Sequence, residues 1–197
     1  MDLEIRRLIA EDAEAVSKLI GRNFLEVNIK DYPKEEMARL AQSYNRAKIL
    51  EMNDWAHFYV ACYGCDIVGC GAIAEFEGKK DESILLTIFV LPERHGKGIG
   101  KQIMCALEND EYYLRAKRIE IAASITACDF YRKLGYDYKN GVRKTDDKGL
   151  YKLEKFKKPA ASNKKTQPFA KDMIMRRMDA ILGSVKHEGI GNWRRRA

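Results

Sequence analysis

The sequence predicts an α+β domain with a central, mixed and mostly antiparallel sheet flanked by helices. Segments that alternate between apolar and polar residues are interspersed with segments whose apolar residues recur at helical spacing. Some predicted strands lead into helices and others into tight turns, so the predicted order is β-α-α-β-β-β-α-β-α-β-β rather than a strict βα repeat. The chain has 197 residues, of which 46% are hydrophobic, enough for one domain with a core and an appendage.

The N-terminal half of the chain predicts a strand, two helices and a hairpin. Residues 3–8 alternate as a half-buried strand does. Asp12 is placed to cap a helix whose apolar stripe is Ala13, Val16, Leu19 and Ile20. After a break at Tyr32-Pro33, a second helix carries Met37, Leu40 and Ala41. Residues 57–62 and 67–76 then predict two strands joined by a turn at residues 63–66.

The second half begins with residues 83–91, SILLTIFVL, which are typical of a strand buried on both faces and ended by Pro92. A helix follows, with one apolar face made of Ile99, Ile103, Ala106, Leu107 and Leu114. Residues 118–123 alternate as a strand. Thr126 is placed to cap a short helix that Gly135 ends. Segments 136–142 and 149–156 predict a closing pair of strands.

The formal charge of +7 is unevenly distributed along the chain. Residues 155–197 hold 12 basic and 3 acidic residues, a net charge of +9. Residues 1–154 hold 24 basic and 26 acidic residues, a net charge of −2, which argues against nucleic acid as the partner of the body.

The C-terminal part of the chain predicts an appendage to a domain at residues 1–156. Residues 157–168 contain no core-forming run and read as a linker. Residues 169–197 predict a basic helix and tail, with an apolar stripe at Ile174, Met178, Ile181, Leu182 and Val185. We expect this stripe to pack on the body or on the mate in a homodimer, with contact to RNA or the ribosome as the alternative.

A glycine-rich turn is the most informative segment. After the buried strand, Gly96, Gly98 and Gly100 alternate up to the start of a helix. Glycines let backbone N–H groups converge, and a helix N-terminus adds unpaired donors, so the segment predicts a phosphate or pyrophosphate site. The spacing fits neither a P-loop, which needs four residues between its glycines and a hydroxyl after the lysine, nor a dinucleotide fingerprint.

This turn resembles the coenzyme A-binding segment of the GNAT superfamily of N-acetyltransferases, [Gln/Arg]-x-x-Gly-x-[Gly/Ala]. His95 stands at the Gln/Arg position, which is a departure, and Gly98 and Gly100 take the small positions. A second match follows one helix and one strand later. Residues 127–136, ACDFYRKLGY, are similar to the family's A-x-x-F-Y-x-K-x-G-[FY], with Ser124 where the family often has Asn.

The resemblance covers residues 1–156 and implies acetyl-coenzyme A as co-substrate. It assigns cofactor binding to Phe89, Val90, Leu91, His95, Gly96, Lys97, Gly98, Ile99, Gly100, Lys101, Ser124, Ala127, Phe130, Tyr131 and Lys133. The side chains of Lys97 and Lys101 either face the phosphates or are solvated surface cations. Backbone groups of the buried strand are implied to pair with the pantetheine arm and to supply an oxyanion donor.

The resemblance also implies the catalytic groups of an amine acetylation. Tyr131 is the implied general acid for the departing thiolate. Glu82, which begins the buried strand, is the candidate general base, with ordered water as the alternative. The sequence thus predicts an N-acetyltransferase that acts by direct transfer in a ternary complex, on an amine of a small molecule, peptide or protein. Two alternatives remain: a non-catalytic acyl-coenzyme A sensor, and an interaction protein that uses its basic tail.

Other features of the chain predict no chemistry. Cys62, Cys65 and Cys70 lack a fourth ligand at a suitable interval, so no metal site is expected. Cys128 has no evident histidine partner for nucleophilic catalysis. No apolar run reaches the ~20 residues that a membrane span needs. Five cysteines, an odd number, together with an N-terminus charged from its second residue, predict a cytoplasmic protein in a reducing compartment.

Overall fold

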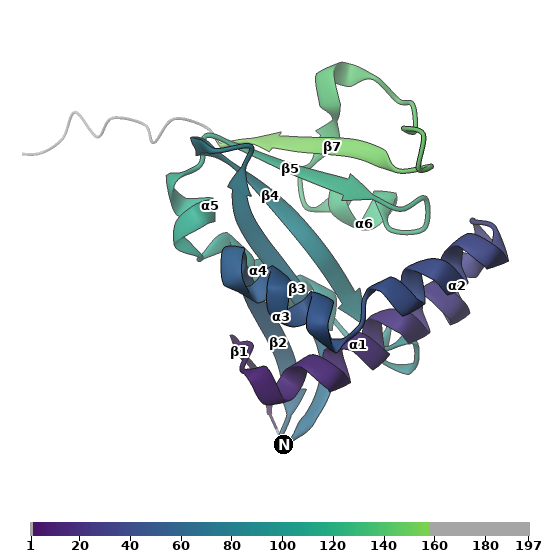
Figure 1. Cartoon of the computed structure of the whole chain (residues 1–197). Helices are drawn as coiled ribbons and strands as arrows, with labels where there is room; N and C mark the ends of the chain where they lie inside the picture. Colours follow the sequence, from purple (N-terminus) through teal and green to yellow (C-terminus); the bar gives the residue numbers. More distant parts are fainter. Residues whose placement is uncertain (1, 158–197) are drawn as a thin grey trace, which may run out of the picture. The chain divides into compact units, whose positions relative to one another are not determined.

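The computed structural model describes residues 2–157 and shows a seven-stranded mixed sheet with helices on both faces (Figure 1). The strand order is β1-β2-β3-β4-β5-β7-β6. The strands are β1 (Leu3–Arg7), β2 (His57–Tyr63), β3 (Asp66–Phe76), β4 (Lys79–Val90), β5 (Arg118–Ala123), β6 (Asp137–Tyr138) and β7 (Tyr151–Phe156). β4 and β5 run parallel and every other neighbouring pair is antiparallel, which confirms the predicted α+β class.

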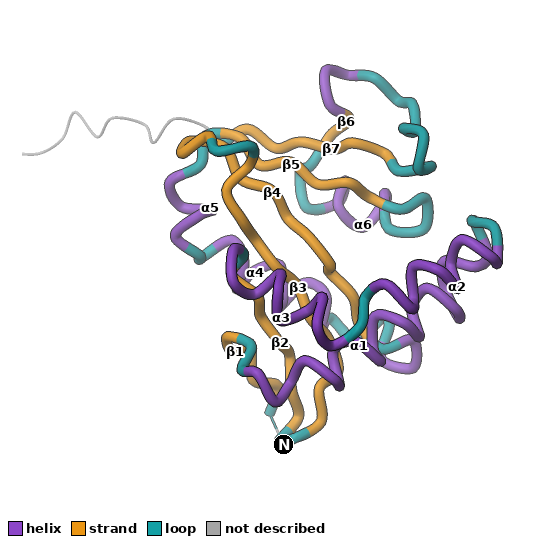
Figure 2. Tube along the Cα trace, viewed as in Figure 1, coloured by secondary structure: helices purple, strands orange, loops and turns teal. Residues whose placement is uncertain are grey.

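The helices form two layers, one on each face of the sheet. α1 (Ala13–Arg22), α2 (Lys34–Ser43) and α3 (Arg46–Trp55) cover one face. α4 (Ile99–Glu108) and α5 (Glu111–Arg115) cover the other, and α6 (Cys128–Lys133) packs beside β5 (Figure 2). Alternation along β2 explains the two layers, because Phe58 and Val60 belong to the core under α1 and α3 while Ala61 belongs to the core under α4.

The sheet divides between β4 and β5. The two strands pair only from Glu82↔Arg118 to Leu85↔Ile121. Beyond Leu85, β4 continues along β3, and beyond Ile121, β5 continues along β7, so the two strands lie side by side where they begin and apart where they end (Figure 1). The facing edges of β4 and β5 therefore do not pair with each other over the second half of β4.

Several predicted elements differ in extent from the structure. α3 was not predicted: it presents only Ile49 and Met52 as fully buried residues, so its apolar periodicity is weak. The helix predicted to run to Leu114 is two helices, because the Asp110 side chain caps a new helix by accepting a hydrogen bond from the Tyr112 N–H. The strand predicted at 136–142 is limited to β6, which a 3₁₀ turn at Lys139–Gly141 follows.

The two predicted helix caps bond elsewhere. Asp12 stands at the N-cap position of α1, but its carboxylate accepts hydrogen bonds from the Arg6 guanidinium and from the Ile9 N–H. The Thr126 hydroxyl donates to the Asp31 carboxylate rather than capping α6, whose N-cap residue is Ala127. Both side chains therefore tie neighbouring segments together instead of closing their own helices.

β7 ends at Phe156, and the predicted linker at 157–168 and basic helix and tail at 169–197 lie outside the described residues except for Lys157. The Lys157 ammonium group donates hydrogen bonds to the last carbonyls of α5, those of Tyr113 and Leu114. Within residues 2–157, no helix has the length and apolar character needed to cross a bilayer.

Candidate active site

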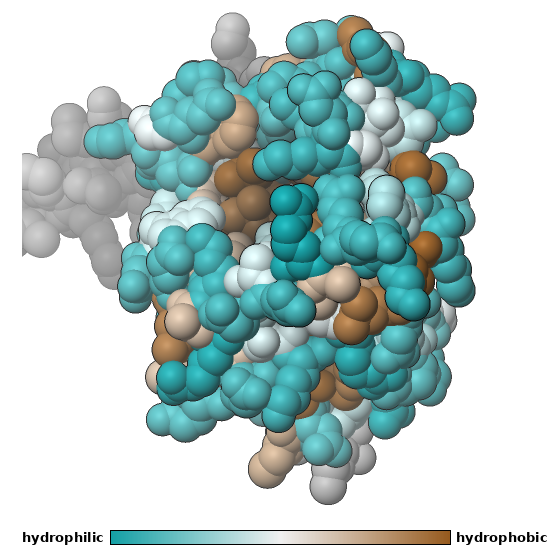
Figure 3. All heavy atoms as spheres, turned by 45° about the vertical axis from the view of Figure 1, so that its right-hand side comes forward, coloured by the Kyte–Doolittle hydropathy of each residue, from teal (hydrophilic) through white to brown (hydrophobic). Residues whose placement is uncertain are grey.

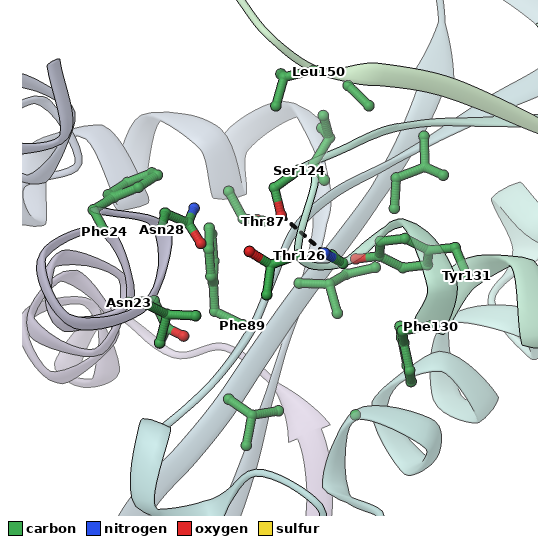
Figure 4. A pocket seen from close by; sticks show the side chains of 18 of the residues that line it. Asn23, Phe24, Asn28, Thr87, Phe89, Ser124, Thr126, Phe130, Tyr131 and Leu150 are labelled. Carbon is green, nitrogen blue, oxygen red and sulfur yellow. Dashed lines mark hydrogen bonds between the residues drawn. The ribbon is translucent and has the colours of Figure 1, made fainter. Parts of the chain in front are cut away.

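A cavity of about 860 Å³ lies where β4 and β5 part. Its wall takes residues from β4, β5, the glycine-rich turn, α6, and the segment between α1 and α2. In the space-filling view, apolar residues are visible in a hollow that hydrophilic residues border (Figure 3). Figure 4 shows Phe24 and Asn28 on one side of this pocket and Phe130 and Tyr131 on the other, with Phe89 of β4 between them.

The glycine-rich turn forms one end of the pocket. Gly96 and Gly98 have φ angles of 75° and 81°, the left-handed region that glycine tolerates best. The first N–H of α4 to find a backbone acceptor is that of Gln102, which bonds the Gly98 carbonyl. No described residue accepts from the N–H groups of residues 98–101, and the imidazole of His95 and the cationic side chains of Arg94 and Lys101 line the same end. The arrangement is suited to an anion such as pyrophosphate.

His95, which departs from the family pattern, bonds to the backbone edge of β4. Its imidazole Nε2 lies 2.8 Å from the Val90 carbonyl oxygen. Because a carbonyl only accepts, the imidazole is the donor and carries its proton on Nε2. The neighbouring Leu91 N–H bonds across to the Val68 carbonyl of β3. The Val90 carbonyl therefore faces the gap between β4 and β5 rather than β3.

Tyr131 lies in the wall formed by α6 and is 4% exposed. Burial raises the pKa of the Tyr131 hydroxyl well above its usual range, so the group keeps its proton at neutral pH. Its ring packs edge-on against that of Phe130 at a centroid distance of 5.1 Å. Phe130 in turn lies against α4 at Gly100, where a Cβ atom would be 3.4 Å from the phenyl ring. The small residue at Gly100 thus lets α6 and the glycine-rich turn approach each other.

β4 contains a bulge within the pocket wall. The register with β3 shifts between Cys70↔Phe89 and Ala72↔Leu86, and Thr87 takes a φ of 49°. A β-branched residue in this region is strained. The Cys70 thiol donates to the Thr87 carbonyl at 3.3 Å, and burial raises the pKa of that thiol to about 12. The Thr87 hydroxyl is buried without a partner among the described residues.

The far end of the pocket is aromatic. The ring of Phe24 lies 5.4 Å from that of Phe89 and 5.5 Å from that of Tyr44. Phe24 belongs to a π-helical segment, Asn23–Val27, that continues α1, a type of helix found frequently at functional sites. Met37 and Leu40 of α2 complete this apolar wall.

Tyr32 connects the two sides of the pocket. Its hydroxyl accepts a hydrogen bond from the Ile125 N–H at 3.0 Å and donates one to the Gly149 carbonyl at 3.0 Å. The bond between Thr126 and Asp31 lies beside it. We call this set of contacts the Tyr32 clasp, because it joins the α1–α2 segment to the β5–α6 and β6–β7 loops.

Glu82, the candidate base, does not reach the pocket. It lies at the first β4–β5 pair, opposite Arg118, whose guanidinium donates to Glu82, Glu120 and Glu154. The Lys79 ammonium group is also 3.4 Å from Glu82. Because these two cationic neighbours hold the carboxylate away from the cavity, this geometry does not support the predicted base role.

Most other predicted site residues surround the cavity. Tyr131 and Phe130 line it with Phe89, Val90, His95, Gly96, Gly98, Ile99, Gly100, Lys101, Ser124 and Ala127. The Ser124 hydroxyl accepts from the Ala127 N–H at 3.3 Å (Figure 4). Leu91, Lys97 and Lys133 are not among the lining residues, and the two lysines are exposed. The sequence singled out neither Tyr32 nor Glu36 as a site residue, because pockets built from helices and loops have no characteristic residue spacing.

Within the described residues, no group of three or more His, Cys, Asp or Glu side chains is arranged to hold a metal ion, and all five cysteines there are free thiols.

Residues 54–138 match a family model described as an acetyltransferase (GNAT) domain. The chain has the GNAT fold. Both motifs on which the resemblance rests lie inside the matched range, so the predicted resemblance is confirmed. A search of curated proteins finds no match.

Solved structures agree with the GNAT assignment at the level of the fold. The PaiA N-acetyltransferase of Thermoplasma acidophilum, in complex with coenzyme A, has a TM-score of 0.68 at 20% identity, over 80% of this chain and 100% of that one. A GCN5-related N-acetyltransferase of Rhodopseudomonas palustris has a TM-score of 0.66 at 21% identity, over 80% and 97%. A GNAT acetyltransferase of Brucella melitensis, in complex with acetyl-CoA, has a TM-score of 0.56 at 17% identity, over 80% and 90%.

Proposed function

We propose that this chain transfers an acetyl group from acetyl-coenzyme A to an amine, directly and within a ternary complex. The observation that carries the proposal is one cavity with unpaired N–H groups at its glycine-rich end, an unpaired β4 edge along it, and the protonated hydroxyl of Tyr131 in its wall. Coenzyme A-bound relatives of the same fold support it.

The residues present fit coenzyme A. The N–H groups of residues 98–101 would hold the pyrophosphate, with Arg94 and Lys101 adding positive charge nearby. The edge of β4 that β5 leaves unpaired would pair with the amides of the pantetheine arm, next to the Val90 carbonyl that His95 bonds. Acetyl-coenzyme A, when bound, supplies a thioester whose acetyl carbon is open to attack by an amine.

Tyr131 supplies the acid in this proposal. As the amine nitrogen bonds to the acetyl carbon and the carbon–sulfur bond breaks, the hydroxyl of Tyr131 gives its proton to the departing sulfur. Its raised pKa favours the protonated form that this step needs. The amine nitrogen loses its proton to water, which can restore Tyr131, since Glu82 lies outside the cavity.

A Gly98→Glu substitution tests the cofactor site. Isothermal titration should detect acetyl-coenzyme A binding to the wild type and none to Gly98→Glu, because a carboxylate would stand among the N–H groups meant for phosphate. Gly78→Glu is the matched control: Gly78 has a φ of 72°, like the 81° of Gly98, and both have open space where a Cβ would stand. Equal binding by Gly98→Glu and Gly78→Glu would show that the turn is not the phosphate site.

A Tyr131→Phe substitution tests the transfer step. We expect kcat to fall by about 10²- to 10⁴-fold, the usual contribution of general acid–base catalysis, with the Kd of acetyl-coenzyme A nearly unchanged. Tyr151→Phe is the control, since the Tyr151 hydroxyl makes no hydrogen bond to a described residue. An unchanged kcat in Tyr131→Phe would remove the acid role, and a wild type that binds acetyl-coenzyme A but acetylates no amine would favour the sensor alternative.

A further inference from the structure

Glu36 is the single carboxylate among the described residues that line the cavity. It lies on α2 and is half-buried. No hydrogen bond or ion pair joins its side chain to any residue in the described range 2–157. Acidic residues close by are engaged elsewhere: Asp31 bonds Thr126, and Asp146 accepts from the N–H groups of Lys148 and Leu150.

The surroundings of Glu36 are mainly apolar. Met37 and Leu40, on the same helix, line the cavity beside the aromatic wall of Phe24, Tyr44 and Phe89. A carboxylate loses hydration in such a place, and apart from the positive end of α2, in whose first turn it stands, Glu36 has no partner within residues 2–157. A ligand cation would supply that partner.

The charges at the two ends of the cavity differ. The glycine-rich end carries the cationic side chains of Arg94 and Lys101. At the opposite end Arg39 and Lys148 also line the opening, but both are exposed and solvated, whereas Glu36 is half-buried. The pKa of the Tyr32 hydroxyl also indicates negative charge at this end of the cavity. Burial raises this pKa most, and the negative charges of Asp31, Asp146 and Glu36 raise it further.

We propose that the acetyl acceptor is an organic amine with an apolar body, and that the Glu36 carboxylate binds it in its cationic form while the body lies on the aromatic wall. This inference rests on the proposed acetyltransferase function. It makes Glu36 a specificity-determining residue, which selects against acceptors that carry a carboxylate beside their amine.

The inference is tested with matched acceptors that share one body. These are 2-phenylethylamine with phenylalanine, and 3-methylbutylamine with leucine, each assayed at saturating acetyl-coenzyme A. In both pairs the amine should have a kcat/KM at least about 10-fold above that of the amino acid, because the added carboxylate would be repelled by Glu36. Preference for the amino acid, or no acetylation of either amine by an enzyme that acetylates other acceptors, would overturn the inference.

Glu36→Gln keeps the size of the side chain and removes its charge. It should raise the KM for 2-phenylethylamine by about 10- to 100-fold, the effect of losing a hydrogen bond to a charged group, with kcat and the Kd of coenzyme A little changed. Glu35→Gln is the matched control, because it makes the same change at the neighbouring, exposed position of α2, which does not line the cavity. Glu36→Asp should keep part of the affinity.

Binding measurements separate the two proposals. Titration of 2-phenylethylamine into the complex with coenzyme A should show binding that Glu36→Gln weakens and Glu35→Gln leaves in place. Equal affinity in wild type and Glu36→Gln would reject the role of Glu36 while the acetyltransferase function stands. Failure of the wild type to bind coenzyme A at all would instead reject the proposed function.

Discussion

The Tyr32 clasp offers a quantitative test of how the cavity walls are held together. Replacing Tyr32 by phenylalanine keeps the ring and removes the hydroxyl, which accepts from the Ile125 N–H and donates to the Gly149 carbonyl, each at 3.0 Å. An average hydrogen bond contributes about 0.5–1.5 kcal/mol net. One of the two bonds is exposed and its groups regain water, so we expect Tyr32→Phe to lower the free energy of unfolding by about 1–2 kcal/mol.

Urea denaturation measures this loss, and amide hydrogen exchange locates it. The Ile125 N–H should exchange about 10-fold faster in Tyr32→Phe, since 1.4 kcal/mol corresponds to a factor of ten, while amides in the centre of β3 keep their protection relative to global stability. Tyr151→Phe removes a hydroxyl that bonds no described residue. It should change the free energy of unfolding, and the free energy of opening derived from exchange at Ile125, by no more than about 0.5 kcal/mol.

Two outcomes would contradict this role of the Tyr32 hydroxyl. One is a Tyr32→Phe protein with wild-type stability and wild-type exchange at Ile125, which would mean that the hydroxyl does not join the loops. The other is a Tyr151→Phe protein whose free energy of unfolding falls as far as that of Tyr32→Phe, which would mean that the loss does not depend on the two hydrogen bonds of Tyr32.

Two further substitutions test the fold. The Arg6 guanidinium holds the pKa of Asp12 below its usual range, so the pair stabilises the protein above about pH 4, the unfolded pKa, and this stability is lost as the pH falls through the lower folded pKa. Asp12→Asn should therefore make the free energy of unfolding fall less steeply with decreasing pH than it does in the wild type. An equally steep fall would contradict this. Thr87→Val replaces a buried hydroxyl, which has no partner among the described residues, by a methyl group of similar shape. Urea denaturation should show that the free energy of unfolding rises by about 1 kcal/mol. A lower free energy of unfolding would show that the hydroxyl has a partner.

The sequence predicted the parts of the site that depend on backbone geometry. Alternating glycines before a helix need no long-range information, because φ angles such as that of Gly98 and the unpaired N–H groups of a helix start are local properties. Tyr131 could be placed because it stands in a short motif at fixed distance from a predicted helix start.

The parts that the sequence did not predict depend on tertiary packing. Glu82 stood at the start of the buried strand, but nothing local showed that Arg118 would pair with it across the β4–β5 ladder. The cavity wall opposite Tyr131 comes from Phe24, Glu36 and Tyr44, which meet only when α1 and α2 fold over the sheet. α3 was not predicted for the same reason. Its apolar periodicity is weak, and packing against neighbouring elements stabilises it more than its own sequence pattern does.

The parting of β4 and β5 has a consequence for association between chains. Unpaired strand edges are templates on which strands of neighbouring molecules add. In this fold the unpaired edges lie inside a cavity that α2, α6 and the Tyr32 clasp border. A β-strand of another molecule, with side chains on both faces, is too wide to enter it. A slender amide-bearing chain such as a pantetheine arm needs much less room. Each cycle of cofactor binding and release would then complete and reopen the hydrogen-bond network of the sheet, and the loaded protein would resist heat better than the empty one.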